Sequence, residues 1–201
     1  MAISVKSCTG NQVEEYLNDL AFWRITVFRE FPYLYEGDID YERQYLQTFF
    51  KAPDSILVIA FDDGKVIGAS TALPLKHETA NVIEPFLTSQ YRIDKMFYYG
   101  ESVLSKPYRG KGIGKAFFNH RASKAVAYGA EYTCFCSVIR PENHPLRPHS
   151  YLPLDSFWQQ EGFVKHPELI CKMSWKDLDE QQETEKSLVF WVKKLESRKD
   201  L

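Results

Sequence analysis

Hydrophobic and polar residues alternate, or form short apolar runs, along several stretches of the chain, and these patterns predict β-strands. The stretches cover residues 3–7, 56–61, 66–73, 96–104, 132–138, 164–166 and 169–175. The sequence Asp62-Asp63-Gly64-Lys65 separates the second stretch from the third, and a turn of this kind predicts a β-hairpin. We expect the last two stretches to form a closing pair of strands.

Elsewhere apolar residues recur at intervals of three and four, which predicts helices. These segments cover residues 13–31, 40–51, 82–89, 112–128 and 154–161. The tail beyond Asp177 places Leu188, Trp191, Val192 and Leu195 in a pattern that predicts an amphipathic C-terminal helix.

The order of these elements predicts an α/β (α+β) fold in which helices flank a mixed, mainly antiparallel central sheet. We expect one domain over residues 1–176 and a helical extension over residues 177–201. The apolar face of that extension would pack on the core or on a second subunit, which leaves room for a homodimer.

Composition narrows the range of functions. The 201 residues are 44% hydrophobic, which suits one substantial core, and a formal net charge of -2 offers no basic field for nucleic acid or an anionic membrane. The four cysteines are too scattered for a disulfide framework, and none belongs to a Cys-x-x-Cys pair that would indicate a metal site. The N-terminus lacks the blocks of a signal peptide and no apolar run reaches membrane-spanning length, so we expect a cytoplasmic protein.

A glycine-rich turn follows the stretch 96–104 and opens the segment 112–128. It reads Arg109-Gly110-Lys111-Gly112-Ile113-Gly114-Lys115. The first N–H groups of a helix have no partner within the helix, and the helix dipole is positive there, so the turn predicts a phosphate-binding loop. The alternative is a structural turn before a buried helix. The spacing fits neither the dinucleotide fingerprint nor the P-loop, which needs Ser or Thr where this chain has Ala116.

Arg109, Gly112 and Gly114 match the Arg-x-x-Gly-x-Gly motif of the GNAT superfamily of acyl-CoA-dependent N-acetyltransferases, and Pro107-Tyr108 precedes them. The hairpin 56–73, the strands 96–104 and 132–138 and a closing Trp158-x-x-x-Gly162-Phe163 stand in the order typical of that superfamily. The chain therefore resembles a GNAT enzyme over most of residues 3–175, and the resemblance implies acetyl-CoA (coenzyme A) as co-substrate.

The resemblance also implies which residues contact coenzyme A. The glycine-rich loop would surround the pyrophosphate through Arg109, Gly110, Lys111, Gly112, Ile113, Gly114 and Lys115. Backbone groups of Val103 and Leu104 would pair with the pantetheine arm as a strand would. Asn143 corresponds to an asparagine that often touches the pantetheine in this superfamily.

Acyl transfer to an amine needs a neutral amine, support for the oxyanion and protonation of the leaving thiolate. Glu101 lies where many GNAT enzymes carry a glutamate base, although a carboxylate there is equally consistent with pairing to a neighbouring lysine. The backbone N–H of Val103 would support the oxyanion. The usual tyrosine acid is replaced by Trp158, whose indole is no acid, so Tyr151 is the candidate acid, the alternative being a role in ordering its loop.

The acceptor in this superfamily usually lies against the first two helices and their link. Here the link contains Tyr33, Tyr35 and Glu36, which suit a cationic amine, while Arg29 just before it suits an acceptor carboxylate. An ordinary solvated loop is the alternative interpretation of these residues.

The leading functional hypothesis is an N-acetyltransferase that moves an acetyl group from acetyl-CoA to a primary amine of a small molecule or peptide. A non-catalytic acyl-CoA-binding module of GNAT type is the alternative, and Trp158 is the best argument for it. A nucleotide-binding domain unrelated to coenzyme A is a third hypothesis.

Overall fold

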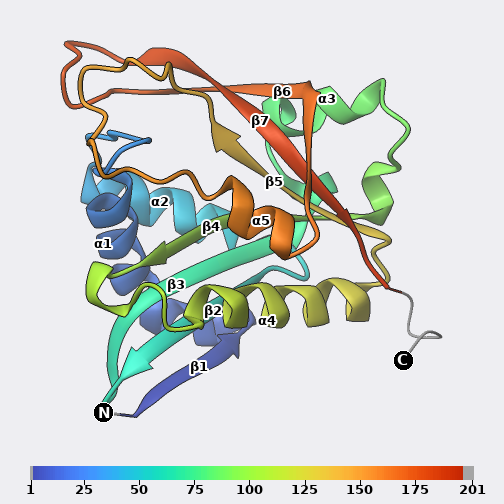
Figure 1. Cartoon of the computed structure of the whole chain (residues 1–201). Helices are drawn as coiled ribbons and strands as arrows, with labels where there is room; N and C mark the ends of the chain where they lie inside the picture. The colour runs from blue at the N-terminus through green and yellow to red at the C-terminus, as the bar shows by residue number, and fades with distance from the viewer. Residues whose placement is uncertain (1, 197–201) are drawn as a thin grey trace.

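Seven strands form one sheet in the order β1-β2-β3-β4-β5-β7-β6 in the computed structural model, which describes residues 2–196 (Figure 1). The strands are β1 Ile3–Cys8, β2 Ile56–Asp62, β3 Lys65–Pro74, β4 Met96–Leu104, β5 Tyr132–Val138, β6 Val164–Trp175 and β7 Thr184–Lys194. Neighbouring strands are antiparallel except β4 and β5, which are parallel. The predicted mixed, mainly antiparallel sheet is therefore confirmed.

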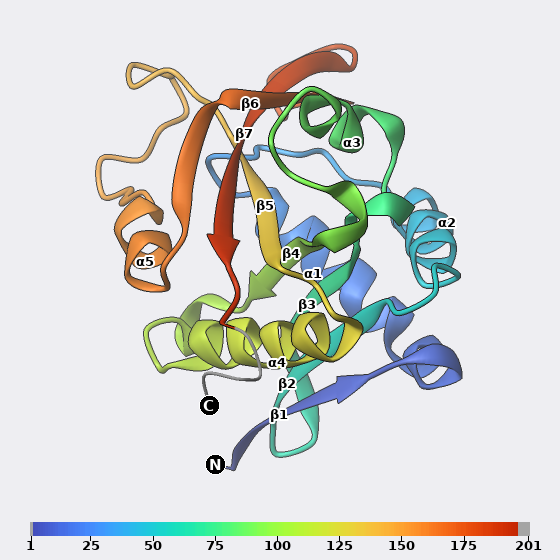
Figure 2. The same cartoon turned by 90° about the vertical axis from the view of Figure 1, so that its right-hand side faces the viewer.

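Helices cover both faces of this sheet (Figure 2). The α-helices are α1 Leu17–Phe28, α2 Ile39–Phe49, α3 Ala80–Leu87, α4 Ile113–Tyr128 and α5 Asp155–Gln160, and the 3-10 segments are η1 Gly10–Tyr16, η2 Leu75–His77, η3 Ile93–Lys95 and η4 Lys106–Tyr108. In β2, Leu57 packs toward α1 and α2, whereas Val58 packs toward Phe117 of α4. Because β2 is covered on both sides, it reads as a continuous apolar run. None of the helices within residues 2–196 is long and apolar enough to cross a bilayer.

The predicted strands β4 and β5 match the observed bounds, and the predicted hairpin is present as β2 and β3. Most other predicted bounds lie within two residues of the observed ones, and two elements differ more. The helix predicted over residues 13–31 begins as η1 and ends at Phe28. The predicted closing pair 164–166 and 169–175 is one strand, β6, whose register against β7 shifts between His166 and Ile170.

The predicted C-terminal helix is wrong. Residues Thr184–Lys194 form strand β7, which lies between β5 and β6 in the interior of the sheet (Figure 1). Phe190 packs in one core and Trp191 in the core on the other face, so both are fully buried. A strand buried on both faces has an unbroken apolar run, which cannot be told from a helix by periodicity alone. The expected homodimer rested on this helix, and residues 197–201 of the expected extension lie outside the described residues.

Strands β4 and β5 pair only over their first three residues, Met96 with Tyr132 through Tyr98 with Cys134. Beyond that point the two strands separate, as their diverging arrows in Figure 1 show. The edge of β4 that faces β5 is therefore free of strand pairing from Tyr99 to Leu104. The divergence exposes a length of β4 backbone in the middle of the sheet.

Candidate active site

A β-bulge interrupts β4 at the point where it leaves β5. Ser70 pairs with Ser102 and Ala72 with Tyr99, so the single residue Thr71 lies opposite both Gly100 and Glu101. A Cβ atom on Gly100 would lie 2.5 Å from the Thr71 Oγ1 atom, so only glycine fits. Bulges redirect the side chains that follow them. Here the bulge turns Glu101 toward α1 and α2.

Glu101 is 5% exposed, and only one of its carboxylate oxygens is hydrogen-bonded within the described residues. Arg24 on α1 donates from Nη1 to Glu101 Oε2 at 2.5 Å, and its Nε donates to Glu42 on α2, a carboxylate that is 1% exposed. Glu101 Oε1 is buried and has no partner in residues 2–196. Burial raises the pKa of Glu101 and the Glu42 charge adds to this, while the Arg24 charge opposes it. Glu101 is therefore a stronger base than an ordinary glutamate, and one of its carboxylate oxygens has no partner within the described residues.

A second arginine lies behind the bulge, on the α4 side. The Arg121 guanidinium is 2% exposed and donates to the backbone carbonyls of Thr71 and Glu101 at 3.4 and 3.3 Å. It stacks over the Tyr99 ring, 4.3 Å from the ring centre. Burial lowers the pKa of Arg121 to about 10, so it keeps its charge at neutral pH. Arg121 thus ties α4 to the bulged backbone that carries Glu101.

Glu101 opens into a cavity of about 530 Å³ between α1, α2 and their link, β4, the start of α3 and β6. The predicted acceptor residues Tyr33, Tyr35 and Glu36 line this cavity, whereas Arg29 does not. The rest of the lining consists of Arg24, Phe28, Asp38, Tyr41, Glu42, Tyr45, Glu78, Thr79, Asn81, Val82, Tyr98, Gly100, Glu101, Cys136, Met173, Ser174, Trp175, Lys176, Glu183 and Leu188. Its size is in the range of small-molecule sites.

Glu78 contributes a second carboxylate to this cavity, from the turn between η2 and α3. Its Oε2 accepts a hydrogen bond from the Thr79 N–H at 3.1 Å, and its Oε1 is buried with no partner in the described part of the chain. Burial raises the pKa of Glu78 to about 7, and the Glu101 charge contributes in the same direction. Tyr45 and Tyr98 line the same part of the cavity.

The α1–α2 link that forms one wall of the cavity is fastened to the other half of the sheet by Arg140, which follows β5. Its guanidinium donates to both oxygens of Asp177, at 2.6 and 2.9 Å, and to the carbonyls of Pro32 and Tyr33, at 2.7 and 2.8 Å. Asp177 is buried, and the Trp175 indole also donates to the Tyr33 carbonyl. The wall is therefore held in place before a substrate binds.

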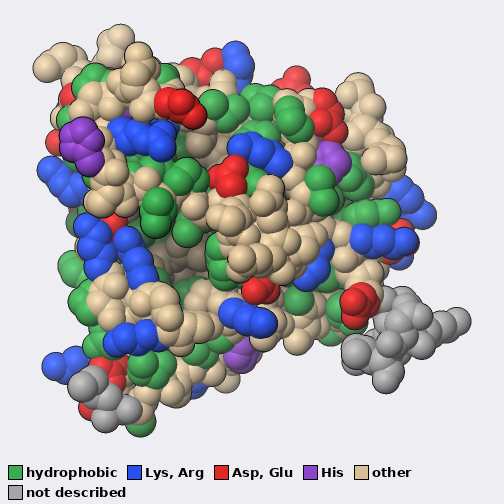
Figure 3. Space-filling view, in the orientation of Figure 1, with side chains coloured by type: hydrophobic (Ala, Val, Ile, Leu, Met, Phe, Trp, Pro, Cys, Tyr) green, Lys and Arg blue, Asp and Glu red, His purple; other side chains and the backbone are tan. Residues whose placement is uncertain are grey.

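The glycine-rich loop lies at the end of β4, before α4. Gly110 and Gly112 adopt φ of 74° and 82°, a left-handed conformation that favours glycine. Gly112 caps α4, and within the described residues no side chain caps this helix end and its first turn carries no acidic residue. Lys111 and Lys115 are exposed, and Figure 3 shows Lys and Arg side chains on the left of this face, where Figure 1 draws the loop. The helix end is suited to an anion.

Arg109 points back from this loop toward α1. It donates to both carboxylate oxygens of Glu30, at 3.0 and 3.1 Å, and to the Leu104 carbonyl at 3.0 Å. The side chain of Val103 is buried beneath α1 and α2, and its backbone pairs with Ala69 of β3. The prediction that the Val103 N–H supports the oxyanion is therefore wrong, because that N–H faces β3. The motif arginine thus secures the loop to the N-terminal half of the chain.

The other predicted residues lie in the irregular segment between β5 and α5. Tyr151 packs edge-on against Phe31, 4.7 Å between ring centres, and lies under Arg147. Neither Tyr151 nor the exposed Asn143 lines the cavity. Trp158, where the superfamily usually has tyrosine, packs with its ring centre 5.0 Å from that of Phe135 and so belongs to the core.

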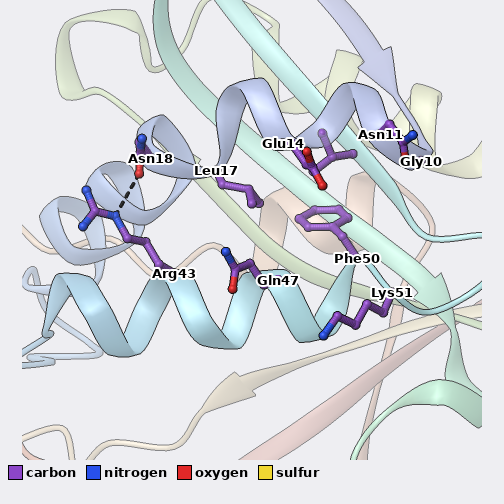
Figure 4. Close-up of a pocket in the computed structure, with 10 residues that line it drawn as sticks. Gly10, Asn11, Glu14, Leu17, Asn18, Arg43, Gln47, Phe50 and Lys51 are labelled. Carbon is purple, nitrogen blue, oxygen red and sulfur yellow. Dashed lines mark hydrogen bonds between the residues drawn. The ribbon is translucent and has the colours of Figure 1, made fainter.

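A second cavity, of about 580 Å³, lies between η1, α1 and α2 (Figure 4). Its lining is mainly polar and includes Asn18, which accepts a hydrogen bond from Arg43 at 2.8 Å. None of the predicted site residues lines it, and none of the buried unpaired oxygens of residues 2–196 belongs to it. The buried carboxylates make the first cavity the candidate active site.

The family model of the acetyltransferase (GNAT) family matches residues 20–148, which include the bulge, the glycine-rich loop, α4 and β5. The chain belongs to the GNAT acetyltransferase family. It is accordingly an acyl-CoA-dependent acetyltransferase with acetyl-CoA as co-substrate. No curated protein matches it in sequence.

Solved structures share the fold at low sequence identity. A ribosomal-protein-alanine N-acetyltransferase from Brucella melitensis has a TM-score of 0.61 and 13% identity, over 96% of this chain and 99% of its own. An N-acetyltransferase from Staphylococcus aureus Mu50 has a TM-score of 0.60 and 14% identity, over 98% and 100%. An aminoglycoside 6'-N-acetyltransferase complexed with coenzyme A has a TM-score of 0.57 and 16% identity, over 98% and 99%. This chain therefore has the same fold as these enzymes over nearly its whole length.

Four residues of the site escaped the sequence analysis: Arg24, Glu42, Glu78 and Arg121. Two of them left a signal in the sequence. Glu42 occupies the buried face of α2 together with Leu46 and Phe49, and Arg121 occupies the buried face of α4 between Phe117 and Ala125. A charged residue at an apolar position of a helix indicates a buried ion pair or a site.

Proposed function

We propose that this GNAT chain transfers an acetyl group from acetyl-CoA to a primary amine of a small molecule or peptide, with Glu101 as the base. The observation that carries the proposal is the free, buried Oε1 of Glu101 at the wall of the cavity. A carboxylate whose pKa is raised accepts a proton more readily, and its free oxygen is within reach of a group in the cavity.

The residues of the glycine-rich loop and of β4 suit coenzyme A. The uncapped start of α4 and the left-handed glycines offer backbone N–H groups to a pyrophosphate, with Lys111 and Lys115 nearby. The unpaired edge of β4, from Tyr99 to Leu104, offers backbone groups to the pantetheine arm. Coenzyme A in the structure of the aminoglycoside 6'-N-acetyltransferase, which has the same fold, supports this proposal. Asn143 is a further proposed contact.

In the proposed reaction, the bound ammonium group of the acceptor gives a proton to Glu101 Oε1, directly or through a water molecule. The neutral nitrogen then attacks the carbonyl carbon of the acetyl thioester, which is the group that acetyl-CoA supplies. A backbone N–H on the unpaired edge of β4 donates to the oxygen on which negative charge develops. The N–H of Val103 faces Ala69 of β3 instead. A C–N bond forms, the C–S bond breaks, and the thiolate takes a proton from the Tyr151 hydroxyl or from solvent. The nitrogen, which carries one proton too many after its attack, gives that proton to the Tyr151 phenolate or to solvent.

Tyr151 is suited to the role of acid in one respect. Its burial against Phe31 raises its pKa, so the phenol stays protonated throughout the neutral range. Tyr151→Phe keeps the edge-on ring contact and removes only the proton. We expect kcat to fall about tenfold or more when the thiolate depends on this residue.

The decisive experiment compares Glu101→Gln with Glu84→Gln, a change of the same chemistry at an exposed residue of α3 outside the cavity. Thiol release from acetyl-CoA with a panel of primary amines gives kcat, and calorimetry gives the Kd of acetyl-CoA. We expect Glu101→Gln to lower kcat by about 10²–10⁴-fold and to leave the Kd unchanged, with Glu84→Gln like the wild type. Acetyl-CoA binding without thiol release for any amine would favour the non-catalytic module.

A further inference from the structure

The candidate acceptor cavity carries far more negative than positive charge. Six carboxylates line it and only two cationic side chains do, and both cations are already paired. Arg24 is hydrogen-bonded to Glu42 and Glu101, and Lys176 lies 2.7 Å from Glu36. The three carboxylates that remain, Asp38, Glu78 and Glu183, have no ion-pair partner in the described residues.

Two of the cavity's carboxylate oxygens are buried and free. Oε1 of Glu101, on β4, and Oε1 of Glu78, at the start of α3, have no hydrogen-bond partner within residues 2–196. Each of these side chains uses its second oxygen for a protein contact, with Arg24 and with the Thr79 N–H respectively. A buried carboxylate oxygen without a partner costs free energy, so its retention beside a cavity points to a ligand with positively charged donors.

The walls between these carboxylates are aromatic and aliphatic. Phe28, Tyr33, Tyr45 and Trp175 present rings, and Val82, Met173 and Leu188 present aliphatic groups. Rings of this kind accept cations on their faces, and the aliphatic groups suit methylene chains. Arg24 already lies over the rings of Phe28 and Tyr45, and Arg140 and Lys186 lie over Trp175, whereas no protein cation lies over Tyr33 within the described residues. A ligand that combines separated ammonium groups with methylenes therefore matches both parts of the lining.

We propose that the acceptor is a linear aliphatic diamine or polyamine, with the reacting amine at Glu101 and a second ammonium group held by Glu78 and the other unpaired carboxylates. This inference rests on the proposed function and names its substrate class. An acceptor with a carboxylate is disfavoured, because both cations of the cavity are committed and Arg29 lies outside its lining.

The test uses three acceptors of matched chain length: an α,ω-diaminoalkane, the alkylamine with one amino group, and the ω-amino carboxylate. We expect kcat/KM to be about tenfold or more higher for the diamine than for the monoamine, and lowest for the amino carboxylate. The series is repeated with chains of about three to six carbons, because the best length reports the span between the two ammonium positions.

Glu78→Gln, which keeps the shape and removes the charge, should lower kcat/KM for the diamine more than for the monoamine and so reduce the preference for the diamine. Glu84→Gln on α3 is the matched control and should keep the preference. Equal kcat/KM for the diamine and the amino carboxylate would overturn the inference and leave the proposed function standing. No turnover of any amine, by protein that binds acetyl-CoA, would instead overturn the proposed function, and the inference with it.

Discussion

Arg24 Nη1 donates to Glu101 Oε2 at 2.5 Å and so occupies one oxygen of the carboxylate, while the other, Oε1, has no partner within residues 2–196. The same guanidinium also pairs with Glu42, so one arginine on α1 pairs with two buried carboxylates, one on α2 and one on β4. Removal of a carboxylate leaves this arginine one partner, whereas removal of the arginine leaves both carboxylates without a cation.

Arg24→Met should therefore destabilise the fold and move the pH dependence of the reaction. Loss of one partner of a buried ion pair costs about 3–5 kcal/mol. Without the Arg24 charge the pKa of Glu101 rises further, so the acidic limb of the kcat profile should move to higher pH. Urea unfolding and a pH–rate profile measure the two effects. Adding Glu42→Gln should restore part of the stability, and an unmoved acidic limb would contradict Glu101 as the titrating base.

Glu78→Gln should stabilise the protein at high pH and not at low pH. The pKa of Glu78 is about 7 in the folded state and 4.5 is its ordinary value, so the folded state holds a proton that the unfolded state releases between these values. Stability from this group is complete below pH 4.5 and is lost as the pH rises through 7. Above pH 7 the variant should gain up to about 3 kcal/mol in free energy of unfolding. Glu84→Gln is the control, and a pH-independent difference would contradict the raised pKa.

Gly112→Asp should weaken acetyl-CoA binding by about tenfold or more, because the new carboxylate lies where the pyrophosphate is proposed to bind. Gly129→Asp is the matched control at the other end of α4. Both glycines are left-handed, with φ of 82° and 87°, and a Cβ on either meets no atom within 4 Å. Each change should cost about 1–2 kcal/mol of stability through backbone strain. Equal affinities of the two variants in calorimetry would argue against the loop as the pyrophosphate site.

Arg140→Ala should raise the KM of the acceptor and leave the Kd of acetyl-CoA unchanged, because Arg140 holds only the acceptor side of the site. Its loss leaves Asp177 buried without its bidentate partner and should cost about 3–5 kcal/mol. A double-mutant cycle with Asp177→Ala tests the pairing, since the second change should cost little once the first is made. Additive losses in chemical unfolding would show that the two side chains act independently.

The sheet was largely predictable because its strands are apolar and separated by turn residues. Met96–Leu104 and Tyr132–Val138 have the predicted bounds, and Gly129 ends α4 in the left-handed conformation that its place in the sequence predicts. The exception, β7, is buried on both faces, so Leu188–Val192 forms an apolar run without a period of two or of 3.6 residues.

The residues of the candidate site also divide into those that the sequence indicates and those that it does not. The glycine-rich loop is local in sequence, so its spacing alone indicated an anion site. The carboxylate system is not local, because Arg24 and Glu101 are separated by 77 positions and only the packing of α1 on the β4 bulge brings them together. Glu78 gave no signal, since a turn glutamate is usually solvated and its burial depends on the neighbouring η2, α3 and β4.

The position of β7 has a consequence for the way the protein is made. Strands leave the ribosome in sequence order, yet β5 and β6 have no pairing partner between them until residues 184–194 emerge. The nascent chain therefore exposes the β7-facing edge of β5, which includes Phe135, until β7 is made. It exposes the edge of β6, which includes Cys171, from the moment β6 emerges. The part of the candidate acceptor cavity that β6 lines is completed late in synthesis, so a nascent chain can form its glycine-rich loop before it completes the proposed amine site.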